Sequence, residues 1–130
     1  CYLPHPGYEI VKASHNITGE AYIDFLSNSW INTTCRGGWR NGMTVKYIEI
    51  GKSLSLPIAD KPDSLDDRLK ELIIEVNSSM DNSQMISNIM YHIENKAILK
   101  EKILEYQNIC EEVYDQSVVI KDFIRNCKEL

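Results

Sequence analysis

The residues with the most definite chemistry in this 130-residue chain are its four cysteines. They are Cys1, Cys35, Cys110 and Cys127. None of them forms a Cys-x-x-Cys pair, the spacing that is typical of zinc sites and of thioredoxin-like redox centres. An even number of widely spaced cysteines is instead typical of disulfide bonds in a protein that leaves the reducing cytosol.

Geometry restricts how these cysteines can pair. Cys110 and Cys127 are 17 residues apart, which is about 25 Å along a continuous helix. A disulfide joins Cα atoms that are only about 4.4–6.8 Å apart. Each of the two must then bond to the N-terminal half, as Cys1–Cys127 with Cys35–Cys110 or as Cys1–Cys110 with Cys35–Cys127. We expect the first arrangement, which ties the two chain ends together.

Three Asn-x-Ser/Thr sequons provide a second kind of chemistry, the attachment of glycans in the secretory pathway. They are Asn16-Ile-Thr18, Asn32-Thr-Thr34 and Asn77-Ser-Ser79. The chain also begins at Cys1 and not at Met, as a mature protein does after removal of its signal peptide. Together these features predict a secreted, extracellular glycoprotein. We expect glycans on at least two sequons, with Asn32 the one that a strand could bury.

Catalytic and metal-binding patterns are missing from the sequence. It has no Gly-rich phosphate loop, no His-Glu-x-x-His helix and no Gly-x-Ser-x-Gly elbow. His5 and His15 are far from His92, which falls among apolar residues, so we expect His92 to be a satisfied interior or boundary residue. The acid pairs at 66–67 and 111–112 point about 100° apart on a helix, unlike converging glycosidase carboxylates. We expect no enzyme, no catalytic residue, no metal site and no cofactor.

The net charge and its distribution limit which kinds of partner the protein can bind. The net charge is −5, and residues 60–130 hold 15 acids against 9 Lys or Arg, whereas residues 1–59 hold 4 acids and 5 Lys or Arg. An acidic surface repels phosphate, which excludes nucleic acid as a partner. No apolar run approaches the roughly 20 residues that cross a bilayer, so we expect no membrane insertion. The partner that remains is a protein receptor or another cell-surface protein.

Helical periodicity organises the second half of the chain. From residue 99 an apolar seam steps by three or four positions, with a possible break near 114–116; it consists of Leu99, Ile103, Tyr106, Cys110, Val113, Ile120, Ile124 and Cys127. An earlier helix can begin at Ser64 as its cap, with an apolar face formed by Leu65, Leu69, Leu72, Ile73, Val76 and Met80. A further helix is expected from Ser83 to an interruption at 94–96, with Met85, Ile86, Ile89, Met90 and Ile93 facing inward.

The N-terminal half of the chain combines helical and strand patterns. Residues 20–31 place apolar side chains at helical spacing, and we expect a helix there, although residues 22–27 also alternate as a strand would. Residues 43–50 are rich in β-branched and aromatic side chains, which predicts the clearest strand of the chain. This strand could pair with residues 31–35 as a hairpin. Residues 8–13 fit a short strand or the start of a helix equally well.

These patterns predict a mainly α fold, a disulfide-linked helical bundle with a short strand or β-hairpin in its N-terminal half. We expect one domain over residues 1–130. Within it, residues 1–59 form an irregular portion with helix and strand, and residues 60–130 form the helical portion. The hydrophobic content of 43% is ordinary for a globular protein.

Residues 110–127 resemble the last helix of interleukin-2 and interleukin-15. The similar features are a Cys-Glu start, an acid a few residues on, and an Asp-Phe-Ile ending where that family has an acid followed by Phe-Leu. The resemblance implies a short-chain four-helix-bundle cytokine that modulates immune cells through a receptor. Receptor-facing residues would be exposed polar ones on the first and last helices, for which spacing suggests Lys121, Asp122 and Arg125.

Three functions therefore stay open. The first is a secreted, cytokine-like ligand of a cell-surface receptor, to which Trp39, in a basic loop with Arg36 and Arg40, could also contribute. The second is an exported viral or parasite host-interaction module, or the receptor-binding part of a larger surface glycoprotein. The third is a carrier that encloses a small hydrophobic ligand between helices lined by Met, Ile and Leu.

Overall fold

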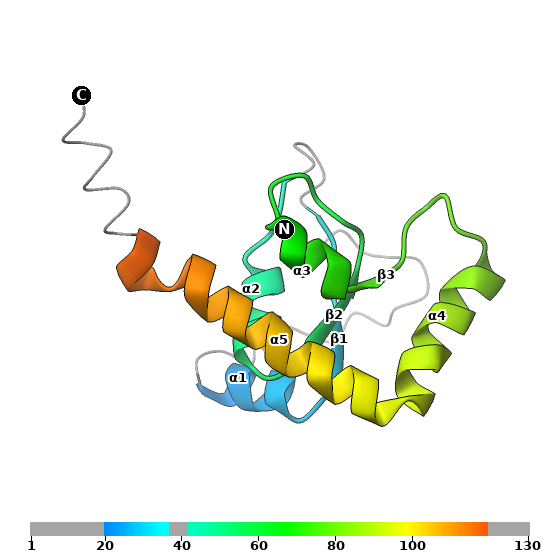
Figure 1. Ribbon diagram of the computed structural model, residues 1–130, viewed down its shortest axis with the longest axis horizontal. Coiled ribbons are helices and arrows are strands. Elements are labelled where there is room, and N and C mark those ends of the chain that lie inside the picture. Colours follow the sequence, from blue (N-terminus) through cyan, green and yellow to red (C-terminus); the bar gives the residue numbers. More distant parts are fainter. Residues whose placement is uncertain (1–19, 37–41, 120–130) are drawn as a thin grey trace, which may run out of the picture.

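The computed structural model describes residues 20–36 and 42–119, and these residues are mainly helical, as expected (Figure 1). In chain order the elements are α1 (Glu20–Ser27), β1 (Ile31–Thr33), α2 (Lys46–Lys52), β2 (Leu56–Ala59), α3 (Asp67–Leu72), β3 (Ile74–Glu75), α4 (Asn82–Glu94) and α5 (Lys96–Tyr114). The expected helix within residues 20–31 and the interruption at 94–96 are confirmed by α1 and by the boundary between α4 and α5.

The three strands form a parallel sheet in the order β1-β2-β3. The connection from β1 to β2 runs through α2, and that from β2 to β3 runs through α3, because parallel neighbours need a crossover. All four residues of the central strand β2 are buried, as in other parallel sheets that are covered by helices. The hairpin that residues 43–50 could have formed with residues 31–35 is not found: β1 does form, but its partner is β2.

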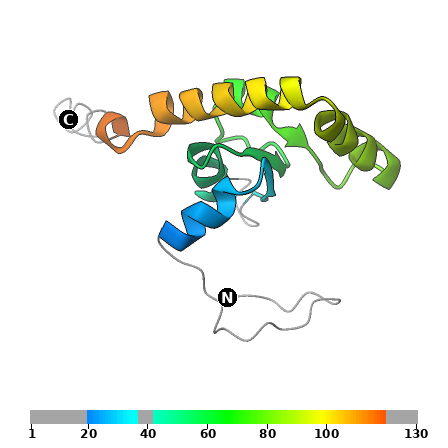
Figure 2. The same cartoon turned by 90° about the horizontal axis from the view of Figure 1, so that it is seen from below.

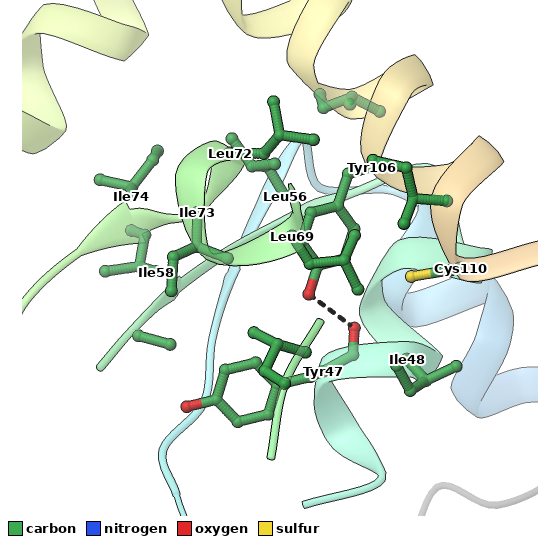
Figure 3. Close-up of a cluster of buried hydrophobic side chains, with 14 of the residues drawn as sticks. Tyr47, Ile48, Leu56, Ile58, Leu69, Leu72, Ile73, Ile74, Tyr106 and Cys110 are labelled. Carbon is green, nitrogen blue, oxygen red and sulfur yellow. Dashed lines mark hydrogen bonds between the residues drawn. The ribbon is translucent and has the colours of Figure 1, made fainter. Parts of the chain in front are cut away.

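Helix α5 covers this unit along the predicted apolar seam. Its buried side chains are Leu99, Ile103, Tyr106, Ile109 and Cys110. They pack with residues of α2, β2 and α3 into one hydrophobic core, shown in Figure 3. In that view the hydroxyl of Tyr106 donates to the main-chain oxygen of Tyr47 at 3.4 Å. The seam is thus confirmed from Leu99 to Cys110, while its last members, from residue 120 on, lie outside the described residues.

The clearest predicted strand, residues 43–50, is wrong. Residues 46–52 form α2, which buries Tyr47, Ile48, Ile50 and Gly51 against the core. Tertiary packing overrides β-propensity here, because positions 47, 50 and 51 share one helical face below α5. The helix ends with Leu54 at a positive φ of 56°, and the N–H groups of Leu54 and Ser55 return to the carbonyls of Gly51 and Ile50, the pattern of a Schellman C-cap.

The helix expected from Ser64 is shorter and starts later. Asp66 is the N-cap of α3, and its carboxylate accepts from the N–H of Arg68 at 2.9 Å. The helix ends at Leu72, because Ile73 is extended and leads into β3. Val76 and Met80, which we expected on the same helical face, therefore lie beyond the sheet.

The expected disulfide linkage is not borne out. Cys35 and Cys110 are both free, so the predicted Cys35–Cys110 bond is wrong, and no disulfide is present within the described ranges. The reason is topological. Cys35 follows β1 at the carboxyl edge of the sheet, whereas Cys110 packs against Gly51 at the far end of α2. Cys1 and Cys127 lie outside the described residues.

We predict that Gly51→Ala destabilises the protein. A Cβ at this position would lie 2.7 Å from the Sγ of Cys110 and 2.7 Å from the ring of Tyr106. Relieving such overpacking costs about 1–3 kcal/mol, whereas Gly→Ala in an uncrowded helix stabilises by about 1 kcal/mol. Urea unfolding measures whether Gly51→Ala lowers or raises the free energy of unfolding. Lys52→Ala, at the exposed next position, is the control, and a more stable Gly51→Ala would contradict the close contact between α2 and α5.

Candidate functional site

A cleft of about 530 Å³ opens at the carboxyl edge of the sheet, and we name it the carboxyl-edge cleft. Every residue that lines it follows a strand: Thr34, Cys35 and Arg36 come after β1, Asp60 and Lys61 after β2, and Val76, Asn77, Ser78 and Ser79 after β3. Parallel strands end at the same edge of a sheet, so the stretches that follow β1, β2 and β3 lie side by side there. The topology therefore brings three separate stretches of sequence to one place.

Asp60 fixes one wall of the cleft. Its Oδ1 accepts from the main-chain N–H of Arg36 at 2.9 Å and from the hydroxyl of Tyr47 at 2.8 Å, and its Oδ2 lies 2.9 Å from the Nε of Arg36. Burial, together with the hydrogen bond to Asp60, raises the pKa of Tyr47. Tyr47 therefore keeps its proton and donates to Asp60 throughout the physiological pH range.

Glu75 organises the opposite wall. Its Oε2 lies 3.3 Å from the Nζ of Lys61, and its Oε1 accepts from the Nδ2 of Asn77 at 2.9 Å. The Oδ1 of Asn77 in turn accepts from the main-chain N–H of Ser79 at 2.9 Å and from its hydroxyl at 2.5 Å. The basic side chains in the cleft wall, Arg36 and Lys61, thus each lie against a carboxylate, so the cleft is polar without a strong charge of either sign.

The two sequons within the described ranges differ in how their amides are used. The Nδ2 of Asn32 donates to the carbonyl of Leu26 at 3.1 Å and to the Oγ of Ser55 at 2.7 Å, which engages both of its N–H groups. Asn77 donates only to Glu75 among the described residues. A glycan can therefore be accommodated on Asn77 without breaking its hydrogen bond, whereas one on Asn32 must displace a bond. Asn16 lies outside the described residues.

A second candidate surface lies on α4, at one end of the molecule beside β3 and the start of α5 (Figures 1 and 2). Ile86, Met90 and Ile93 are 61%, 42% and 40% exposed, and their spacing of i, i+4 and i+7 places them on one face, which we name the α4 stripe. We expected these three residues to face inward, and that expectation is wrong. His92 is buried instead, as expected, with its Nδ1 2.8 Å from the carbonyl of Asn88.

The start of α4 is fixed by a capping box. The carboxylate of Asp81 accepts from the N–H of Gln84 at 2.8 Å, and the side chain of Gln84 accepts from the N–H of Asp81 at 3.0 Å. On the side away from the stripe, the Nδ2 of Asn88 donates to the main-chain oxygen of Glu75 at 2.9 Å. The stripe therefore lies on a helix whose start is capped and whose opposite face is hydrogen-bonded to β3.

Comparison with protein-family models, with curated proteins and with solved structures finds no match to this chain. Within the described residues, no group of three or more His, Cys, Asp or Glu could hold a metal ion. Nor is any helix there long and apolar enough to cross a membrane. Four receptor-facing candidates from the sequence lie outside the described residues: Trp39, Lys121, Asp122 and Arg125.

Neither surface was found by sequence reasoning. The carboxyl-edge cleft depends on β2 and β3, for which no strand was predicted. The signal for the α4 stripe was present as the helical spacing of Ile86, Met90 and Ile93, but periodicity does not tell whether anything covers an apolar face.

We predict that Cys35 is labelled by iodoacetamide in the native protein and that Cys110 is not. Cys35 is exposed, whereas burial raises the pKa of the Cys110 thiol to about 12, so at pH 8–9 it stays protonated as long as the chain is folded. Peptide mapping after labelling, with and without denaturant, gives the two rates. Equal labelling in the native state, or Cys110 found in a disulfide, would contradict the packing of α5 on α2.

Proposed function

We propose that this protein is an exported glycoprotein that binds a protein partner at a cell surface, and that the α4 stripe is its main contact. The observation that carries the proposal is the exposure of Ile86, Met90 and Ile93 together on one face of a capped helix. Adjoining apolar side chains exposed on a soluble protein are typical of an interaction site. Export is supported by the three sequons.

The spacing of the stripe fits one mode of recognition, in which a helix lays its i, i+4 and i+7 side chains into an apolar groove of another protein. The composition of α4 agrees with this mode, because Glu94 is its one acidic residue and it contains no Lys or Arg. The centres of protein interfaces are similarly poor in charge and rich in large apolar and aromatic side chains. A helix that binds an anionic lipid surface or a phosphate backbone instead needs basic residues along its polar face.

A cytokine-like receptor ligand and a host-interaction module are both proteins of this kind, and the proposal includes either. The residues that the interleukin resemblance suggested for receptor contact, Lys121, Asp122 and Arg125, lie outside the described residues, so the proposed contact rests on α4. The partner is therefore described by its chemistry, as a folded ectodomain with an uncharged apolar groove.

We predict that Ile86→Asp together with Met90→Asp weakens binding of a cell-surface ectodomain by at least about tenfold, the loss of a typical hot spot. Both side chains are exposed, so the variant should unfold at nearly the same urea concentration as the native sequence. An arrayed panel of purified ectodomains identifies the bound member, and titration measures its affinity.

Ser87→Asp is the charge control: it adds one negative charge, against two in the double variant, to the same helix about a quarter turn from the stripe. It should leave binding unchanged. Equal binding by all variants would contradict the proposal. Sedimentation measures self-association of the native chain, and a dimer that the double variant abolishes would assign the stripe to a second copy of this chain instead.

We further predict that the protein from a eukaryotic secretory host carries a glycan on Asn77 and none on Asn32. Both N–H groups of Asn32 are engaged inside the fold, so a glycan there would break a native bond, whereas Asn77 donates only to Glu75 among the residues that the structure describes. Glycopeptide mass mapping before and after enzymatic removal of glycans tests each sequon separately. A protein that reaches the medium without any glycan would remove the sequons as support for export.

A further inference from the structure

Asn77 belongs both to a sequon and to the wall of the carboxyl-edge cleft. An N-linked glycan begins at the side-chain nitrogen of its asparagine, and Asn77 is one of the residues that line the cleft, so its sugar would begin beside the cleft. We propose that the carboxyl-edge cleft seats the first sugar of a glycan carried by Asn77. This inference rests on the proposed export of the protein, because such glycans are attached in the secretory pathway.

The amide of Asn77 is held in one orientation. Its Oδ1 accepts two hydrogen bonds from Ser79, and its Nδ2 donates one to Glu75. Attachment replaces one amide hydrogen by the C1 carbon of the sugar, and the lipid diphosphate that carried the sugar leaves with the proton. All three hydrogen bonds can persist after this exchange. The first sugar therefore leaves the protein in a direction that the fold sets.

The cleft wall offers what an uncharged sugar needs. Thr34 and Ser78 provide hydroxyl groups, and Lys61 and Arg36 provide N–H donors. The charges of the two basic side chains are balanced by Glu75 and Asp60. A charged ligand would have to compete with one of these ion pairs, whereas a neutral polyhydroxyl ligand can hydrogen-bond to the walls and leave both pairs in place.

The walls of the cleft also matter, because most glycans project into solvent from an open turn. The stretches after three different strands line the space next to Asn77, which has a volume of about 530 Å³ and is open to solvent. The wall that faces β3 is held in place by Asp60, which is bonded to both Arg36 and the core residue Tyr47. The seat is therefore already formed before the sugar arrives, which lowers the cost of ordering it.

The test is a native-state deglycosylation. The full chain is produced in a eukaryotic secretory host, and an endoglycosidase that cuts after the first sugar is applied to the folded and to the unfolded protein. We expect release from Asn77 to be about tenfold slower in the folded protein, because the enzyme must wait for the sugar to leave its seat. Glycopeptide mapping follows Asn77 alone.

The decisive comparison is between two lysine variants. Lys61→Ala removes a donor from the cleft wall together with the ion pair to Glu75, and should speed native release about threefold, the effect of losing one hydrogen bond of modest strength. Lys100→Ala removes an exposed lysine from α5, away from the cleft, and should change nothing. Urea unfolding of both variants shows that the fold is retained, as expected for exposed or partly exposed charges.

The outcomes separate this inference from the proposed function. Absence of any glycan on Asn77 overturns the inference and removes one support for export. A glycan that is present but released equally fast from folded and unfolded protein overturns the inference and leaves export standing. If release is slow and Lys61→Ala does not change its rate, the glycan is protected by something other than the cleft wall, and the inference is also overturned. Slow release that Lys61→Ala relieves and Lys100→Ala does not supports the seat.

Discussion

The close approach of α5 to α2 is the constraint on which the remaining structure depends. Gly51 has no Cβ, and the Tyr106 ring and the Cys110 thiol occupy the space where one would be. This absence lets α5 lie across α2 closely enough for its seam to reach β2 and α3 as well. Because α2 is also the crossover between β1 and β2, the contact at Gly51 fixes the sheet relative to its covering helix.

Tyr47 transmits this arrangement to the carboxyl-edge cleft. It is fully buried beside the seam of α5, where its main-chain oxygen accepts from Tyr106. Its hydroxyl extends from the core to Asp60, which in turn holds Arg36 at the end of β1. The bond to Asp60 requires the hydroxyl proton of Tyr47, and burial raises the pKa of Tyr47 so that this proton is retained. The polar wall of the cleft is thus attached to the apolar core through one side chain.

The sequence allowed the parts of the fold that depend on local periodicity to be predicted. The seam from Leu99 to Cys110 is an example, because its burial follows from helical spacing alone. The sheet could not be predicted in this way. Pro57 lies in the central strand although proline has no N–H for a ladder and is usually confined to edges. The residues of α2 have strand propensity, but their packing under α5 decides their structure, and no local signal reports that contact.

The two candidate sites could not be predicted from local sequence either, because each depends on partners distant in sequence. Glu75, in a strand of only two residues, contacts both the carboxyl-edge cleft and α4. Its carboxylate holds Lys61 and Asn77 at the cleft, and its main-chain oxygen accepts from Asn88 of α4.

Burying the α4 stripe would require α4 to turn about its axis. That rotation would break the bond to Asn88 and would move the buried His92 toward water. Polar anchors on one side of α4 therefore keep Ile86, Met90 and Ile93 exposed on the other.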